Sequence, residues 1–170
     1  VFAEDNPGIL FTEAANRAVI YIGRCAQILD VQAGLFGSLL VHDGLIQDAS
    51  MSSDGRRVVT ASQDRTAAII DTESGKVVTK LEGHSYFVNS ARFSRDGSKL
   101  ITASADRSAR IWDASTGKQI GEPILHSGWV ETASFSPDGT IAVTSSDSTV
   151  QLFDATSGLR MGLPIRHHRD

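Results

Sequence analysis

The chain alternates between short apolar runs and short polar turns, with the two-residue period of β-strands. In residues 87–93, β-forming residues are frequent and apolar or small side chains alternate with polar ones over most of the segment. The turn 94–97 follows, and its Gly97 supplies the positive φ that a tight hairpin needs. Further strands are predicted at 99–102, 108–112 and 118–125. Pro123 places the last strand at a sheet edge, because proline donates no ladder hydrogen bond. No segment shows a helical period.

This strand pattern repeats along the chain. An Asp-Gly pair and a histidine each recur at a step of 42 in residue number, since 96 − 54 and 126 − 84 are both 42. The repeated positions are Asp54-Gly55, Asp96-Gly97 and Asp138-Gly139, with His42, His84, His126 and His168. Behind each Asp-Gly pair come a Thr/Ser cluster, an Asp, an apolar run and a closing Asp. Four short strands in a repeat of about 40–45 residues are typical of a β-propeller blade.

The repeat divides the chain into consecutive units. We expect one blade in each of the ranges 42–83, 84–125 and 126–167, and the start of a further repeat at 168–170. Residues 1–41 are predicted to be a degenerate blade with strands at 6–11, 17–22 and 26–30. In that unit the Asp-Gly turn is absent, and Gly23 stands near the position that Asp64 occupies in the next unit.

The third unit resembles a WD repeat. The residues that carry the resemblance are Gly83-His84, Phe93-Ser94-Arg95-Asp96-Gly97, Ser104-Ala105-Asp106 and Ile111-Trp112-Asp113. The linker 116–124 is similar to linkers of WD repeats in large bacterial proteins. The resemblance implies an all-β fold, a β-propeller with four consecutive four-stranded blades that form part of a seven- or eight-bladed ring. It also implies a scaffold for protein–protein interaction, within a larger bacterial regulatory protein or complex.

In WD repeats, a His, a Ser or Thr, an Asp and a Trp of one blade form a hydrogen-bonded chain. The resemblance assigns this structural network to His84, Ser104, Asp106 and Trp112. Partial networks are expected in the neighbouring units, where Ile70 and Phe153 replace the tryptophan. Their members are His42, Ser62 and Asp64 in the second unit, and His126, Ser146 and Asp147 in the fourth.

Histidine, serine and aspartate also suggest a catalytic triad. A triad is one constellation beside one oxyanion site, whereas this set recurs once per repeat and is therefore distributed over several blades. For the same reason the repeated histidines do not converge on one metal ion. We expect no catalytic residue, no metal and no cofactor, and the protein is predicted not to be an enzyme.

Binding is expected on the upper face, where each WD blade presents its His-bearing and Asp-bearing loops. The candidate contacts for a protein are Trp129, Phe87, Tyr86, Leu45, Arg65 and Arg107. Exposed aromatic side chains on a rigid face are typical anchors for a partner. As the alternative, the apolar side chains begin the innermost strands and pack inside, and the arginines only solvate their loops.

Composition narrows the choice of partner. The formal net charge of −4 argues against a nucleic-acid partner, whose binders carry a basic face. No apolar run reaches the ~18–20 residues that cross a bilayer, so no membrane insertion is expected. The single cysteine, Cys25, fits a reducing compartment and predicts a cytoplasmic protein. The first residues lack both an initiator Met and a signal peptide, which suggests a piece of a longer chain.

Two functions follow from these observations. The leading hypothesis is an interaction scaffold for other proteins or peptides; the alternative is a small-molecule or peptide sensor that uses the mouth of the channel. Four blades leave a propeller open, and an uncovered blade exposes an apolar face. We therefore expect either further blades or self-association of two copies to complete the ring.

Overall fold

The computed structural model describes residues 7–11, 17–144 and 149–166, and these residues form sixteen β-strands and no helix. The first sheet contains β1 (Gly8–Phe11), β2 (Arg17–Ile22), β3 (Cys25–Asp30) and β4 (Leu35–Val41). The second contains β5 (Ile46–Met51), β6 (Arg57–Ser62), β7 (Ala67–Asp71) and β8 (Val77–Leu81). The third contains β9 (Val88–Phe93), β10 (Lys99–Ser104), β11 (Ser108–Asp113) and β12 (Gln119–Leu125). The fourth contains β13 (Thr132–Phe135), β14 (Ile141–Thr144), β15 (Thr149–Phe153) and β16 (Arg160–Arg166).

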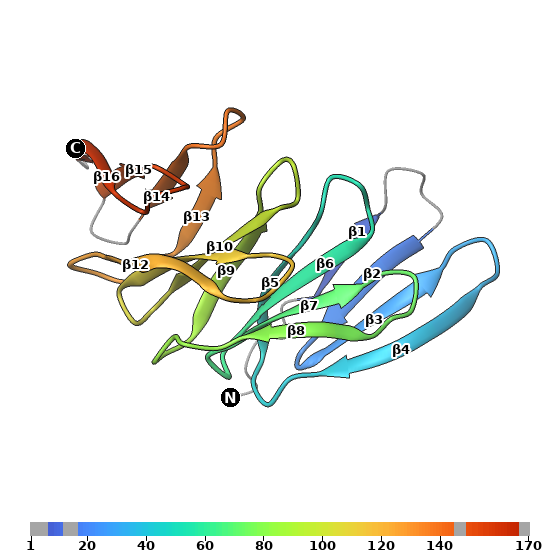
Figure 1. The fold of residues 1–170 in the computed structure, drawn as a ribbon. Coiled ribbons are helices and arrows are strands. Elements are labelled where there is room, and N and C mark those ends of the chain that lie inside the picture. The colour runs from blue at the N-terminus through green and yellow to red at the C-terminus, as the bar shows by residue number, and fades with distance from the viewer. Residues whose placement is uncertain (1–6, 12–16, 145–148, 167–170) are drawn as a thin grey trace.

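Each sheet is an antiparallel meander whose strands pair in chain order. The sheets follow one another across the molecule from the N-terminal to the C-terminal side (Figure 1). Every sheet lies inside one of the four ranges that the repeat delimits, and we refer to the sheets as the first to fourth blades. The prediction of an all-β propeller fold is confirmed at this level. Pro123 lies in β12, an edge strand, as expected.

The middle strands are apolar on both faces because each inner sheet is packed between two others. In β10, Leu100 packs with Trp112 in the core shared with the second blade. The next residue, Ile101, packs with Ile111 in the core shared with the fourth blade. The side chains of Leu100 and Ile101 are both fully buried. Burial of this kind replaces the strict apolar–polar alternation of a one-sided sheet.

The repeated Asp-Gly turns are hairpins held by their own side chains. In the third blade, the Ser94 hydroxyl donates to Asp96, whose carboxylate also accepts the Ser98 backbone N–H. Gly97 then adopts φ +70°, a conformation that costs glycine little. These bonds hold the pKa of Asp96 at about 2, chiefly through the hydroxyl groups of Ser94 and Ser98.

Polar contacts join neighbouring blades in addition to their cores. The Arg57 guanidinium donates to the carbonyl of Gly97 over 2.6 Å and lies 5.4 Å from the centre of the Phe93 ring. Arg92 of the third blade forms an ion pair with Asp48 of the second. These contacts tie the second blade to the third and add to the packing of their shared core.

The two outermost blades each leave one apolar face open. On the first blade the exposed side chains include Phe11 and Leu39, and on the fourth they include Leu152 and Ile165. Leu152 pairs with Met161 across β15 and β16 in the same register as Ile111 with Ile120 across β11 and β12. The outward face of the fourth blade therefore repeats the face with which the third blade packs on the fourth.

Among the described residues, no helix has the length and apolar character that crossing a membrane requires.

Candidate functional site

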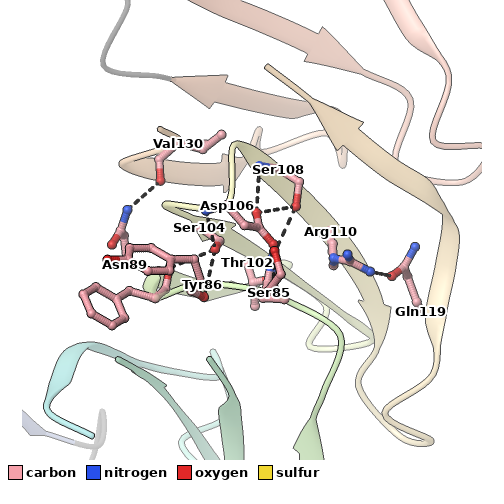
Figure 2. A network of polar contacts seen from close by, with 12 residues as sticks. Ser85, Tyr86, Asn89, Thr102, Ser104, Asp106, Ser108, Arg110, Gln119 and Val130 are labelled. Carbon is pink, nitrogen blue, oxygen red and sulfur yellow. Dashed lines mark hydrogen bonds and ion pairs between the residues drawn. The ribbon is translucent and has the colours of Figure 1, made fainter. Parts of the chain in front are cut away.

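A chain of four buried groups crosses the third blade. The Trp112 indole N–H donates to the Thr102 hydroxyl oxygen over 2.9 Å. The same hydroxyl lies 2.7 Å from His84 Nε2, and His84 Nδ1 lies 2.8 Å from Asp106 Oδ2. A neutral imidazole satisfies every member, since Nδ1–H donates to the carboxylate while Nε2 accepts the Thr102 proton. Figure 2 labels two members of this chain, Thr102 and Asp106, together with Ser108, which donates to Asp106.

The hydroxyl in this chain differs from the one predicted. The sequence assigned that position to Ser104, whereas the structure places Thr102 between His84 and Trp112. Thr102 lies inside β10 on the face that Trp112 also occupies, but the pairing with β9 shifts register between Ala103 and Ser104. Ser104 instead donates to the Phe87 carbonyl over 2.8 Å and accepts the Asp106 N–H over 3.0 Å.

The sequence signal for this hydroxyl fitted two residues, and it was assigned to the wrong one. Threonine recurs at the repeat step at Thr60, Thr102 and Thr144. Thr102 lies two residues before the end of β10, within the continuous pairing with β11, and so shares a face with its cross-strand neighbours. Ser104 is the last residue of β10 and is free to turn into the loop.

The second blade keeps the network without its tryptophan. His42 Nδ1 lies 2.7 Å from Asp64, and His42 Nε2 lies 2.8 Å from the Thr60 hydroxyl. Thr60 thus stands where Ser62 was expected, and the Ser62 hydroxyl donates to the Gly44 carbonyl. Because Ile70 carries no donor, this shorter chain ends at the threonine.

In the fourth blade, the histidine of the expected network has a different partner. Ser146 and Asp147 lie outside the described residues. His126 Nδ1 lies 3.1 Å from the Gln151 side-chain nitrogen. Gln151 occupies the position of Arg110 in the third blade, two residues before the aromatic side chain of Phe153.

The Asp106 carboxylate is fully engaged inside its own blade. Its Oδ1 accepts the Ser108 hydroxyl and N–H over 2.6 and 2.9 Å, and its Oδ2 accepts the Ser85 N–H as well as His84. Burial by itself raises the pKa of Asp106, but the hydrogen bonds from His84 and Ser108 outweigh it and hold the pKa well below its usual range. Asp64 has a lowered pKa by the same balance, with Thr66 and His42 as donors.

This geometry resembles a catalytic triad, but its chemistry is structural. The Thr102 hydroxyl is buried and has two partners in the chain, so it reaches no substrate. A nucleophile needs an accessible oxygen beside donors for the oxyanion. The network joins β10, β11, the turn between them and the His-bearing loop, and it fixes the position of that loop. Within the described residues, no group of three His, Cys, Asp or Glu side chains is placed to hold a metal ion.

The predicted binding residues lie in the upper loops, close in sequence to the histidines and aspartates of the networks. Trp129 and Tyr86 are 55% and 46% exposed, and the Tyr86 ring stacks on Phe87 with 4.3 Å between centroids. Phe87 and Leu45 are half-buried. Tyr86 and Trp129 line a shallow hollow of about 670 Å³ between the third and fourth blades. We call this the upper hollow; its other lining residues include Ser85, Asp106, Arg107 and Ser127.

Arg65 and Arg107 occupy equivalent exposed positions in the upper loops of their blades. Their φ angles are +76° and +68°, a left-handed conformation that is uncommon for residues other than glycine. The Arg107 carbonyl accepts the His126 backbone N–H over 2.9 Å. Each arginine is therefore held at the tip of a turn that is bonded into the frame.

A family model for the WD domain, G-beta repeat, matches residues 35–71, 75–113 and 117–154. The matched segments are offset from the sheets, since segment 75–113 begins with the outer strand β8 of the second blade and ends with β11 of the third. Each repeat therefore spans two blades and ties them together covalently. A search of curated proteins found no match. Because the three matched segments make up more than half of the chain, the protein belongs to the WD40-repeat family.

Proposed function

We propose that this chain is a docking platform, and that a partner protein binds its upper face over the third and fourth blades. WD40 domains are generally scaffolds for protein interaction and are typically non-catalytic. The observation that carries the specific proposal is the exposure of Trp129 and Tyr86 beside the upper hollow. Large aromatic side chains on a preorganised surface contribute strongly to protein binding, because few rotamers are lost on association.

The frame beneath this surface supports the same proposal. The network of His84, Asp106 and Thr102 fixes the loop that carries Tyr86, and the Asn89 amide donates to the Val130 carbonyl over 3.0 Å (Figure 2). Val130 follows Trp129 directly, so this bond fixes the second aromatic residue relative to the third blade. The partner then meets a surface that needs little reordering.

The wider context is part of the proposal. The upper face serves as the docking end of a larger cytoplasmic regulatory protein of bacterial type, as the repeat linkers and the single cysteine favour. The ring is completed by further WD blades, either from a longer chain or from a second copy. The support for this is the apolar face that each outer blade leaves open.

Partner capture from an extract of the source cells tests the docking surface. The immobilised chain is compared with Trp129→Ala and Tyr86→Ala, and with Val78→Ala as the control. Val78 is also exposed but lies on the outer strand β8. We expect proteins that are retained by the chain and by Val78→Ala to be lost from both aromatic variants, with unchanged melting temperatures. Equal retention by all four proteins would contradict the proposal.

A further inference from the structure

The upper hollow presents one uncompensated charge. Of the described residues that line it, only Asp106 and Arg107 are ionic. The Asp106 side chain is 4% exposed, and both of its oxygens are occupied by donors of the same blade. Arg107 is exposed, and among the described residues no carboxylate lies within ion-pair distance of its guanidinium. The accessible charge of the upper hollow is therefore positive, although the chain as a whole is acidic.

The described loops that line the upper hollow bring no exposed carboxylate to Arg107. The second blade begins with the exposed Asp43, whereas Ser85 and Ser127 stand at the equivalent positions of the third and fourth blades. Glu131 is exposed two residues after Trp129 but does not line the upper hollow. Among the described residues of the third and fourth blades, an anionic group can thus approach Arg107 without meeting an exposed carboxylate in the hollow itself.

An apolar surface lies beside this charge. The Trp129 side chain and the stacked pair of Tyr86 and Phe87 come from the loops of two successive blades. Arg107 comes from the turn between β10 and β11 of the third blade. Its backbone carbonyl accepts the N–H of His126, the first residue of the fourth blade. Guanidinium and carboxylate form strong, often bidentate, charge-assisted hydrogen bonds, and the aromatic rings favour an apolar neighbour.

We infer that the upper hollow binds an acidic–apolar peptide segment, in which an Asp or Glu carboxylate pairs with Arg107 and an adjacent apolar side chain lies against Trp129 and Tyr86. This inference rests on the proposed function, because it names the chemical class of the partner at the same surface.

Selection from a phage-displayed library of random peptides tests the inference. We expect the recovered peptides to carry Asp or Glu next to a large apolar residue. The most enriched peptide, made synthetically, is then titrated by fluorescence anisotropy. Its affinity should fall about tenfold or more in Arg107→Gln, as expected for loss of a charge-assisted hydrogen bond, and comparably in Trp129→Ala. The matched control is Arg65→Gln, which removes the same charge from the same turn of the second blade and should change affinity less than about threefold.

The other outcomes separate the two proposals. Peptides without an acidic residue, which lose affinity in Trp129→Ala but not in Arg107→Gln, would overturn the acidic class and leave the docking surface standing. Peptides unaffected by Trp129→Ala, or no recovered peptides at all, would overturn both. Equal losses of affinity in Arg65→Gln and Arg107→Gln would mean that the chain attracts acidic peptides generally, which would overturn the inference. Binding that appears only after the acidic residue of the peptide is replaced by phosphoserine would mean a phosphorylated partner, and it would overturn the inference as well.

Discussion

The Trp112 indole nitrogen lies 2.9 Å from the Thr102 hydroxyl oxygen, so the largest fully buried side chain among the described residues is tied to the same hydroxyl that binds His84. One hydroxyl therefore satisfies two buried nitrogen atoms. In the second blade the equivalent Thr60 hydroxyl binds His42 and the Ala68 carbonyl but no indole, because Ile70 replaces the tryptophan. The two blades thus provide a natural comparison of the same network with and without its aromatic end.

Replacing Thr102 with valine should cost more stability than the same change at Thr60. Thr102→Val keeps the shape but leaves the Trp112 N–H and His84 Nε2 without their partner, at about 2–4 kcal/mol in the free energy of unfolding. Thr60→Val leaves one such nitrogen and should cost about 1–2 kcal/mol. Urea unfolding of both variants measures the difference. Equal losses would mean that the bond to Trp112 contributes nothing.

The contribution of Trp112 to stability can be divided into the part from packing and the part from its hydrogen bond. Trp112→Ala should lower the free energy of unfolding by roughly 3–5 kcal/mol, as for other buried aromatic truncations. Trp112→Phe fills most of the space and should cost about 1–2 kcal/mol, since Phe153 serves at the equivalent position of the fourth blade. A loss in Trp112→Phe as large as in Trp112→Ala would show that the indole N–H, and not the packed volume, dominates.

The blades could be predicted from the sequence because each repeats the same turns and apolar positions. The spacing of Asp54, Asp96 and Asp138 located three sheets, and the weak first unit was found through its apolar strands. The choice between Thr102 and Ser104 was beyond reach, since both are hydroxyl residues at the repeat step and only the register shift in β10 separates them. The fourth strand of the first blade, β4, was not predicted either, because its apolar run lacks a polar alternation.

Acid should destabilise the protein partly through Asp106. Because the pKa of Asp106 is lower in the folded chain than in the unfolded chain, the unfolded state takes up the proton first as the pH falls. The stabilisation is complete above about pH 4, the usual range of an unfolded Asp, and is lost progressively below it. In Asp106→Asn, the melting temperature at neutral pH should be lower and its decline between about pH 4 and pH 2 shallower.

The control for this titration is Asp43→Asn, which removes one exposed carboxylate from the same face. Below pH 4, the melting temperature of Asp43→Asn should fall with pH as steeply as that of the unaltered chain. Identical slopes in the unaltered chain and in Asp106→Asn would contradict a special contribution from the buried carboxylate.

The left-handed turn at Arg107 gives a prediction that is independent of binding. At φ +68°, Arg107→Gly removes steric strain at the expense of a more flexible unfolded chain, so stability should stay within about 1 kcal/mol of the original or rise. Arg107→Val places a β-branched residue in the same conformation and should cost about 1–2 kcal/mol more than glycine. Thermal unfolding of Arg107→Gly and Arg107→Val measures this difference. Equal stability of the two variants would show that the turn relaxes without cost.

The open face of the fourth blade predicts self-association of the isolated 170-residue chain. Val150 and Leu152 pair with Ile165 and Met161 in the register with which Ala109 and Ile111 pair with Ile124 and Ile120, and the latter four pack on the next blade. When such a face is exposed to water, the chain forgoes about 25 cal/mol of stabilisation for each Å² of apolar surface left unburied. A second copy restores this burial if its first blade packs there, and two such contacts related by a two-fold axis close an eight-bladed ring.

Light scattering behind a sizing column measures the mass directly. We expect a dimer for the unaltered chain and a shift toward monomer in Leu152→Asp, with Val78→Asp on the outer strand β8 as the matched control. An aggregating sample that Leu152→Asp renders soluble would mean that further blades of a longer chain, and not a second copy, cover this face. A monodisperse monomer with a cooperative unfolding transition would contradict both, because it would show that the outward face of the fourth blade is stable in water without a neighbour.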